Sequence, residues 1–494
     1  MGFFKRPTLR NRDDKRTRAA ELTLRESIYP LCLVTILFFL WGFSYGLIDT
    51  LNKHFQVVLG ITRSRSSGLQ AAYFGAYPLA SLGHANWILR HWGYKACFIW
   101  GLFLYGVGSL IAWPCLLYRS FGGFCAAIFV IGNGLGSLET AANPYLAVCG
   151  PPKYSEIRIN IAQAFNGIGT VVAPVLASYV FFKNTGTDQN ALESVQWTYL
   201  AIACFVFALA VVYAYSSIPE ITDADMAFQA ESTHAGTDVK PFRKQYRLFH
   251  ATFAQFCYTG AQVAIAGAFI NYVTETRVIN GVPTSSSTAS QFLAGAQGAF
   301  TLGRFAGSGI MKFVRPRWVF LVFMTMCIIF IIPAITERGN TGMSMLYIVL
   351  FFESIIFPTI VALGMRGLGK YSKRGSGFIV AGVAGGAVVP PLLFAASDSQ
   401  GKPNPQTGHA PTAIAMTVPM AFFIAAWSYS FCINFVPAYR NVADSFSTTE
   451  IGISNAHAND PENQLASGRE GEGVMAKDET PSRTEAVVPN EKAS

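Results

Sequence analysis

One carboxylate lies in the middle of a run of apolar residues that is long enough to cross a bilayer as a helix. The run covers about residues 124–149, and Glu139 is followed one helical turn later by Asn143. A charge near the bilayer centre costs several kcal/mol by insertion scales, so such a residue is rarely kept for packing. Glu139 therefore indicates a buried polar site in a transport pathway. The alternative is an interhelical hydrogen bond from a protonated Glu.

Polar side chains recur on the neighbouring apolar runs. In residues 157–182, Asn160, Gln163 and Asn166 are spaced by three and share roughly one helix face. Asp49 lies near the end of the first run, at about 28–51. Carboxylates and amides can donate to and accept from the hydroxyl groups of a polar ligand. The alternatives are a loop-end residue for Asp49 and helix–helix contact for the amides.

Aromatic rings could cover the apolar face of such a ligand. Trp41, Tyr45 and Tyr145 are candidates, although in a chain that is 14% aromatic any one of them can be ordinary packing. His84 is a lone histidine in an apolar run, and we expect it to be packed rather than to relay protons.

The composition is that of a polytopic membrane protein. The 494 residues are 51% hydrophobic and 13% charged, against about 25% charged in ordinary soluble domains. The net charge of +9 comes from short basic clusters between apolar runs, which is the positive-inside pattern and excludes a nucleic-acid surface. The nine cysteines stand singly, without the spacing of a metal site or a disulfide framework.

Twelve apolar runs predict an all-α membrane protein with twelve transmembrane helices in two six-helix, pseudo-symmetric bundles. Lys and Arg concentrate in the loops on the side of the two termini, so both termini are predicted to be cytosolic. The predicted domains are a cytosolic tail at 1–27, an N-terminal bundle at 28–217, a cytosolic linker at 218–247, a C-terminal bundle at 248–437 and a disordered tail at 438–494.

The two halves echo each other in sequence. Residues 169–176, Gly-Thr-Val-Val-Ala-Pro-Val-Leu, match residues 386–393, Gly-Ala-Val-Val-Pro-Pro-Leu-Leu. Glu139 precedes Pro144 by five residues, and Glu353 precedes Pro358 by the same number. These echoes pair runs that are six apart, which is typical of a secondary transporter with a site between its repeats. We therefore expect Glu353 to face the cavity.

The chain resembles the major facilitator superfamily and, within it, the fucose–proton symporter family. The resemblance covers about residues 30–400, and its motifs are Phe-Phe-Leu-Trp-Gly at 38–42 with Asp49, Leu-Glu-Thr-Ala-Ala-Asn-Pro at 138–144, Arg-Ile-Asn-Ile-Ala-Gln-Ala-Phe-Asn at 158–166, Phe-Cys-Tyr-Thr-Gly-Ala-Gln at 256–262, Gly-Arg-Phe at 303–305, and Pro-Thr at 358–359 leading to Gly-Ser-Gly-Phe-Ile-Val at 375–380.

The resemblance implies alternating access to a central cavity, with a sugar and a proton moving together. It implies that Asp49 and Glu139 are the protonatable and sugar-contacting groups and that the amides of Gln163 and Asn166 line the cavity. Gln262 and Arg304 occupy matching positions in the second half.

The chain departs from the family pattern at four places. The pattern has Asn where Gly46 stands and Tyr where Phe357 stands, no acid at Glu353, and no long polar tail. These departures leave the identity of the sugar open.

We therefore predict a proton-coupled symporter of a monosaccharide, which is L-fucose or a related hexose such as galactose or glucose. A nutrient sensor on a transporter scaffold and a transporter of another small polar solute are the alternatives. An intramembrane enzyme is disfavoured because no His/Asp or Ser/Lys constellation is present. We expect no cofactor beyond the coupling proton, no nucleic-acid partner, and a monomer that spans the lipid bilayer of the plasma membrane.

The basic loops make the topology testable. A peptide tag inserted in the linker at 218–247 is expected to stay unlabelled by antibody in intact cells and to become labelled after permeabilisation. Labelling from outside intact cells would contradict a cytosolic linker.

Overall fold

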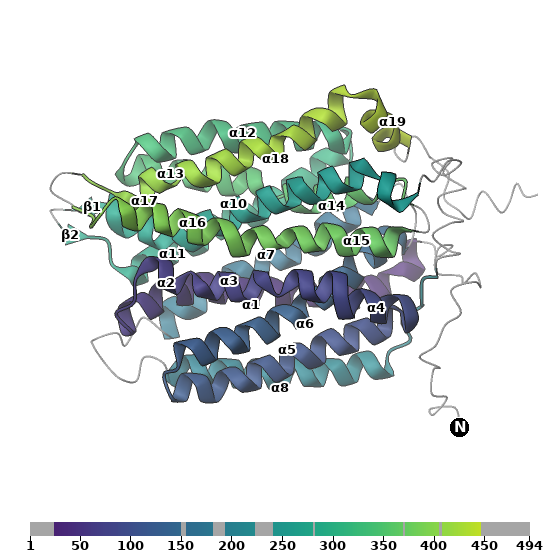
Figure 1. Ribbon diagram of the computed structural model, residues 1–494, viewed down its shortest axis with the longest axis horizontal. Helices are drawn as coiled ribbons and strands as arrows, with labels where there is room; N and C mark the ends of the chain where they lie inside the picture. The colour runs from purple at the N-terminus through teal and green to yellow at the C-terminus, as the bar shows by residue number, and fades with distance from the viewer. Residues whose placement is uncertain are drawn as a thin grey trace, which may run out of the picture.

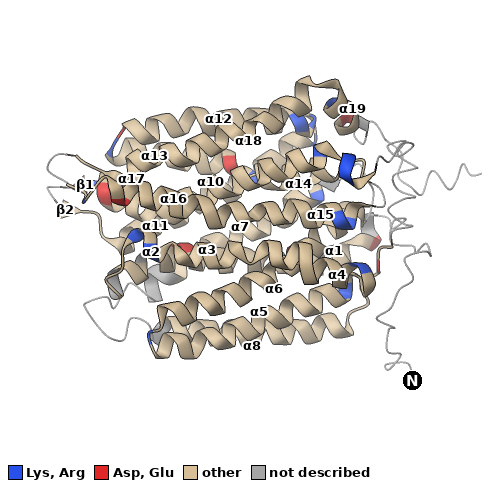
Figure 2. Cartoon of the chain, viewed as in Figure 1, with Lys and Arg blue, Asp and Glu red and all other residues tan. Residues whose placement is uncertain are grey.

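The computed structural model describes residues 24–149, 155–180, 193–222, 241–279, 282–368, 371–404 and 408–445. Long helices lie side by side in one bundle, with α2, α17 and the small β1–β2 hairpin at one end and α4, α15 and α19 at the other (Figure 1). We call these the α2 end and the α19 end. Lys and Arg gather chiefly at the α19 end, whereas the middle of the bundle is almost free of charge (Figure 2).

The helices of the first half follow in chain order. They are α1 (Leu24–Val58), α2 (Arg63–Ser66), α3 (Gly68–Gly75), the π-helical turn η2 (Leu79–His84), α4 (Ala85–His91), α5 (Gly93–Leu117), α6 (Phe121–Val148), α7 (Ser155–Val180) and α8 (Glu193–Tyr215).

The second half repeats this course with more interruptions. Its elements are the 3-10 turn η5 (Phe242–Lys244), α10 (Tyr246–Thr276), β1 (Val278–Ile279), β2 (Val282–Pro283), α11 (Ser286–Met311), α12 (Pro316–Thr336), α13 (Gly339–Glu353), α14 (Ile356–Met365), α15 (Ser372–Ala381), the 3-10 turn η7 (Gly382–Ala384), α16 (Gly385–Ser399), α17 (Pro411–Ala415), α18 (Thr417–Phe435) and α19 (Pro437–Ser445).

The described residues contain twelve segments of membrane-spanning length, as the sequence predicts. Ten are long and apolar enough to span a membrane by composition alone. The other two are α11, whose Gln and Arg residues lower its hydropathy, and the segment α3–η2–α4, which Pro78 and the kink at Gly83 divide. Proline removes a helical hydrogen bond, so this division is expected on chemical grounds.

The helix boundaries correct the sequence prediction at several places. Helix α1 begins before residue 28 and runs to Val58, so Asp49 is an interior residue of the helix and not a loop-end residue. Helix α10 begins before residue 248, at Tyr246. The predicted disordered tail begins with a helix, α19, which the Asp444 carboxylate ties to Arg315 and Arg317 at 2.9 and 2.8 Å. Residues 1–23, 223–240 and 446–494 lie outside the described residues.

Each half is built on one close helix pair. In the first half α1 packs on α7 where Gly42 leaves no room for a Cβ against the Asn166 carbonyl. In the second half α10 packs on α16 in the equivalent way, with Gly385 against the Phe256 carbonyl. Small residues let helices in a membrane approach to backbone contact. The pseudo-symmetry that the sequence echoes predict is therefore present in the packing.

The two halves meet through α7 with α11 and through α3 with α16. At the α19 end the Ser376 hydroxyl on α15 donates to the Thr140 carbonyl on α6 at 3.1 Å, and Gly377 lies against Ser81 and Asn86. At the α2 end the halves are joined as well. The bundle is closed at both ends around the residues between the halves.

A polar cluster, which we call the latch, closes the α2 end. The Arg63 guanidinium lies 3.2 Å from the Glu275 carboxylate and donates to the Ser397 hydroxyl at 2.6 Å. The same carboxylate accepts from the Thr412 backbone N–H at 2.9 Å and hydroxyl at 2.8 Å. Asp398 accepts from the Ser64 backbone N–H at 3.2 Å. All of these groups must separate before the α2 end can open.

The latch predicts that loss of the Arg63 side chain shifts the protein toward a conformation that is open at the α2 end. In Arg63→Ala, a reporter Asn52→Cys beneath the latch should react about tenfold faster with a membrane-impermeant thiol reagent, since charge-assisted bonds contribute roughly 1.5–3 kcal/mol. Arg65→Ala is the matched control, because Arg65 is an exposed residue of the same short helix. Equal labelling rates in the two variants would exclude a closing role for Arg63.

Candidate functional site

The centre of the site is a contact between the halves made by Arg304. Its guanidinium, carried on α11, donates to both the backbone carbonyl and the side-chain Oε1 of Gln163 on α7, the latter at 2.7 Å. The Arg304 side chain is fully buried and its guanidinium carbon lies 4.5 Å from the ring centroid of Phe300. Arg304 thus joins α11 of the second half to α7 of the first half, and its role in a transport pathway stays a prediction.

Glu139 lies on α6, buried beside this contact. The Asn143 amide, one turn along the same helix, faces its carboxylate, and Arg304 is within electrostatic reach. Neither carboxylate oxygen of Glu139 and neither polar atom of the Asn143 side chain has a hydrogen-bond partner. Glu139 is therefore a buried carboxylate without a hydrogen-bond partner, which is rare in folded proteins.

Asp49 is a second unsatisfied carboxylate, on α1. The Tyr45 hydroxyl and the Gln70 amide face it without completing hydrogen bonds of good geometry. Gly267 of α10, in the other half, lies directly against the Gln70 amide and the Asp49 carboxylate. The absence of a side chain at Gly267 is what lets the two halves meet at Asp49.

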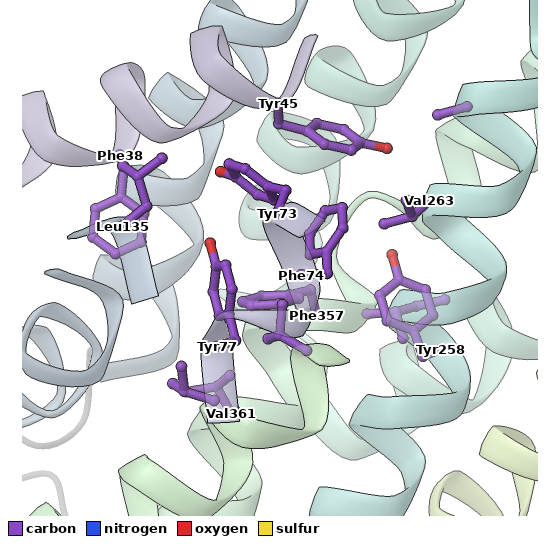
Figure 3. Packing of buried hydrophobic residues seen from close by; sticks show 14 of the residues in the cluster. Phe38, Tyr45, Tyr73, Phe74, Tyr77, Leu135, Tyr258, Val263, Phe357 and Val361 are labelled. Carbon is purple, nitrogen blue, oxygen red and sulfur yellow. The ribbon is translucent and has the colours of Figure 1, made fainter. Parts of the chain in front are cut away.

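Gln70 and Tyr73 of α3 and Tyr77, which lies between α3 and η2, complete the site, and the sequence reasoning missed them. Gln70 faces Asp49, while Tyr73 and Tyr77 are within electrostatic reach of Glu139. Figure 3 shows the rings of Tyr73 and Tyr77 between Leu135 on one side and Tyr258 on the other. Tyr73 and Tyr77 follow Gln70 by three and seven residues, a helical spacing that places all three side chains on one face. This spacing could have identified the three residues from the sequence, but the helical pattern is difficult to recognise because α3 is short.

The aromatic residues sort into two groups. The Trp41 indole donates to the Tyr77 hydroxyl and its ring lies 5.9 Å from the ring of Phe357 in the other half. The Tyr45 and Trp41 rings are stacked at 6.2 Å. Tyr145, by contrast, donates to the Pro219 carbonyl at 3.1 Å, away from the site. Trp41 and Tyr45 thus line the site, and Tyr145 is packing.

The remaining amides differ in position. Asn166 lies where α7 touches α1, with its Nδ2 lacking a partner, and the Gln163 Nε2 also lacks one. Gln262 is buried one turn after Tyr258 on α10, on the face that carries the Tyr258 ring toward Arg304. No described contact joins Gln262 to Glu139 or Asp49, so its membership of the site stays a prediction.

His84 is packed, as the sequence predicts. The Trp100 indole N–H donates to its Nδ1 at 3.0 Å, and its Nε2 lies 3.2 Å from the Asn133 side-chain oxygen. Because Nδ1 accepts and Nε2 donates, both ring nitrogens of a neutral imidazole are satisfied. Within the described residues no three His, Cys, Asp or Glu side chains come together as a metal site would require.

A small cavity lies beside Glu139. A cavity of about 10 Å³ is lined by Leu37, Phe38, Trp41, Leu135, Leu138, Glu139 and Ala142. About 10–15 Å³ is needed to hold one water molecule. This cavity lies between α1 and α6 of the first half, and it is too small for a ligand larger than water.

Comparison with known proteins agrees with this architecture. Residues 32–391 match the Major Facilitator Superfamily. The chain is 31% identical over 398 residues to the L-fucose-proton symporter of Escherichia coli (strain K12), covering 76% of this chain and 89% of that protein. The chain belongs to the Major Facilitator Superfamily, and within it to the fucose–proton symporter family.

Other members of the superfamily are similar as well. The Glucose/galactose transporter of Brucella abortus biovar 1 (strain 9-941) is 31% identical over 379 residues, covering 76% of this chain and 89% of that protein. The crystal structure of FucP in the outward conformation superposes with a TM-score of 0.64 at 28% identity, covering 82% of this chain and 98% of that one. The proton:xylose symporter XylE shares the fold alone, with a TM-score of 0.59 at 12% identity over 83% of this chain and 96% of that one.

The contact between Arg304 and Gln163 can be tested by a double-mutant cycle. Arg304→Met and Gln163→Ala should each lower the stability of the detergent-solubilised protein, and their combination should be less than additive by about 1.5–3 kcal/mol, because hydrogen bonds to charged groups contribute that much.

Arg304→Met with Tyr145→Phe is the control pair, since the Tyr145 hydroxyl bonds to Pro219 and not to the site. This pair should be additive within about 0.5 kcal/mol. Additive behaviour of the first pair would show that the two side chains are not coupled.

Proposed function

We propose that this protein is a proton-coupled monosaccharide symporter that works by alternating access. The observation that carries the proposal is the set of unsatisfied polar atoms between the halves. They belong to Tyr45, Asp49, Gln70, Tyr73, Glu139, Asn143, Gln163, Asn166 and Arg304. An unpaired buried polar group costs roughly 1–3 kcal/mol, so a cluster of them calls for a polar ligand.

The chemistry of this cluster suits a sugar. Carboxylate and amide groups accept and donate to hydroxyls, and the Trp41 and Tyr45 rings can cover the apolar face of a pyranose. L-fucose, galactose and glucose are the substrates that we favour, because the similar proteins of Escherichia coli and Brucella abortus are named for them.

We assign the coupling proton to Asp49 and sugar binding, coupled to protonation, to Glu139. Helix α1 passes Glu139 at Leu37–Trp41 and reaches Asp49 eight residues beyond Trp41, about 12 Å closer to the α2 end. With cytosolic termini the α2 end faces outside, where the protons arrive. No described ion pair involves Asp49, so it must lose its charge before it is occluded.

The same proposal includes the cellular setting. The Lys and Arg residues at the α19 end support cytosolic termini and a cytosolic linker (Figure 2). We further propose that the chain functions as a monomer in the plasma membrane and needs no cofactor besides the coupling proton.

The function is tested by uptake into proteoliposomes that contain the purified full-length protein. Labelled L-fucose, D-galactose and D-glucose should be screened with and without an inward proton gradient. We expect accumulation of at least one of them above its outside concentration, and abolition of that accumulation by a protonophore. A nutrient sensor would bind a sugar without accumulating it, and a carrier of another solute would leave all three sugars outside.

Variants of Asp49 and Glu139 distinguish the roles of the two carboxylates. Asp49→Asn resembles the permanently protonated form and should abolish uphill accumulation while keeping sugar binding and exchange. Glu139→Ala should lose binding, at a cost of about 1–3 kcal/mol or more, because it removes a partner from a desolvated site. Calorimetric titration of each variant with the sugar measures the binding. Loss of binding in Asp49→Asn with binding kept in Glu139→Ala would reverse the assignment.

A further inference from the structure

A third carboxylate, Glu353, is buried in the second half. It lies at the end of α13, where the spanning helix is interrupted before α14 begins at Ile356. The Ser354 backbone N–H bonds the carbonyl three residues back, at Phe351, and the Glu353 carbonyl instead accepts from the Tyr258 hydroxyl at 2.6 Å. Discontinuous helices near the middle of the membrane are the places where carriers hold coupling ions.

The Glu353 side chain is 1% exposed, and its Oε1 has no hydrogen-bond partner. The Ser354 hydroxyl beside it also lacks one. The titratable groups that face Glu353 are Tyr258 of α10, Cys327 of α12 and Tyr45 of α1, and none of them is a cation. The C-terminal end of a helix is itself partly negative, which disfavours an ionised carboxylate there.

The buried carboxylates outnumber the cations that could balance their charge. Three carboxylates, Asp49, Glu139 and Glu353, are each no more than 5% exposed. Among the described residues the cation within electrostatic reach of this group is Arg304, which faces Glu139. Net charge in the middle of a bilayer is costly. One ionised carboxylate balances Arg304, so the other two must bind protons when the carrier is closed.

We propose that Glu353 is a second proton-binding residue and that this carrier moves two protons with each sugar, one on Asp49 and one on Glu353. The inference rests on the proposed symport. In each cycle the two carboxylates bind protons from outside and release them inside, and the sugar moves with them. Its ligand at Glu353 is a proton, since the described residues that face it offer hydroxyls and a thiol but no second carboxylate for a metal cation.

Stoichiometry is measured by the steady-state sugar ratio in proteoliposomes that contain the full-length protein, with the membrane voltage clamped to zero by potassium and valinomycin. The sugar is whichever of L-fucose, D-galactose or D-glucose the wild type accumulates. Each coupled proton contributes about a tenfold sugar ratio per pH unit of gradient. The wild type should therefore reach about 100-fold per pH unit, and Glu353→Gln about tenfold.

Glu337→Gln is the matched control, because Glu337 is an exposed acid at the end of α12 and should keep the ratio of the wild type. A wild-type ratio of about tenfold per pH unit overturns the proposal while leaving the symport intact. A wild type that accumulates no sugar overturns both. A ratio that follows a sodium gradient instead of the pH gradient assigns Glu353 to sodium and overturns the proton assignment.

A second measurement does not require transport. Sugar added to weakly buffered, detergent-solubilised protein should draw more protons from solution in the wild type than in Glu353→Gln at equal sugar occupancy. Equal proton uptake by the two proteins would show that Glu353 is a permanently protonated packing residue.

Discussion

The cost of an unpaired polar group in a dry interior is the constraint on which the rest of this structure depends. Carboxylates and amides from α1, α3, α6 and α7 and the Arg304 guanidinium from α11 lie close together with atoms that lack hydrogen-bond partners. Native proteins satisfy nearly all such atoms. Here they are held in place because the surrounding helices are packed to backbone contact through glycines, as at Gly42 and Gly385. The helix packing around the site is therefore tight, although polar atoms of the site lack hydrogen-bond partners.

The same constraint explains how the two halves can move. Within a half, the helices pack extensively on one another, as α5 does on α6 and α10 on α16, so each six-helix bundle can behave as one body. Between the halves, the described polar contacts concentrate at the latch, at Arg304 with Gln163 and at Ser376 with Thr140. A few bonds of this kind can be exchanged for bonds to water at an opened end, because a neutral hydrogen bond contributes only about 0.5–1.5 kcal/mol net and one to a charged group about 1.5–3 kcal/mol.

Much of this could be predicted from the sequence. Length and hydropathy predict the twelve spans, and Glu139 identifies the site because an acid in an apolar run is conspicuous. Gln70, Tyr73 and Tyr77 were missed because Pro78 and Gly83 interrupt the helical pattern of that span, and because Tyr is also common in packing. The latch could not be predicted either, because Arg63, Glu275 and Asp398 are brought together only by the contact between halves. The position of Asp49 was misjudged because α1 continues into polar residues.

The departures from the family pattern have different consequences in this structure. A Cβ at Gly46 would lie 3.0 Å from the Thr170 carbonyl and 3.0 Å from the Ala173 Cβ, so this position faces α7 and influences how closely two helices pack. Phe357 instead packs against Trp41 at the site, where the family pattern has a Tyr hydroxyl. The loss of that hydroxyl removes one hydrogen-bonding group from the second half. The sugar preference of this carrier should therefore be set at Phe357 and not at Gly46.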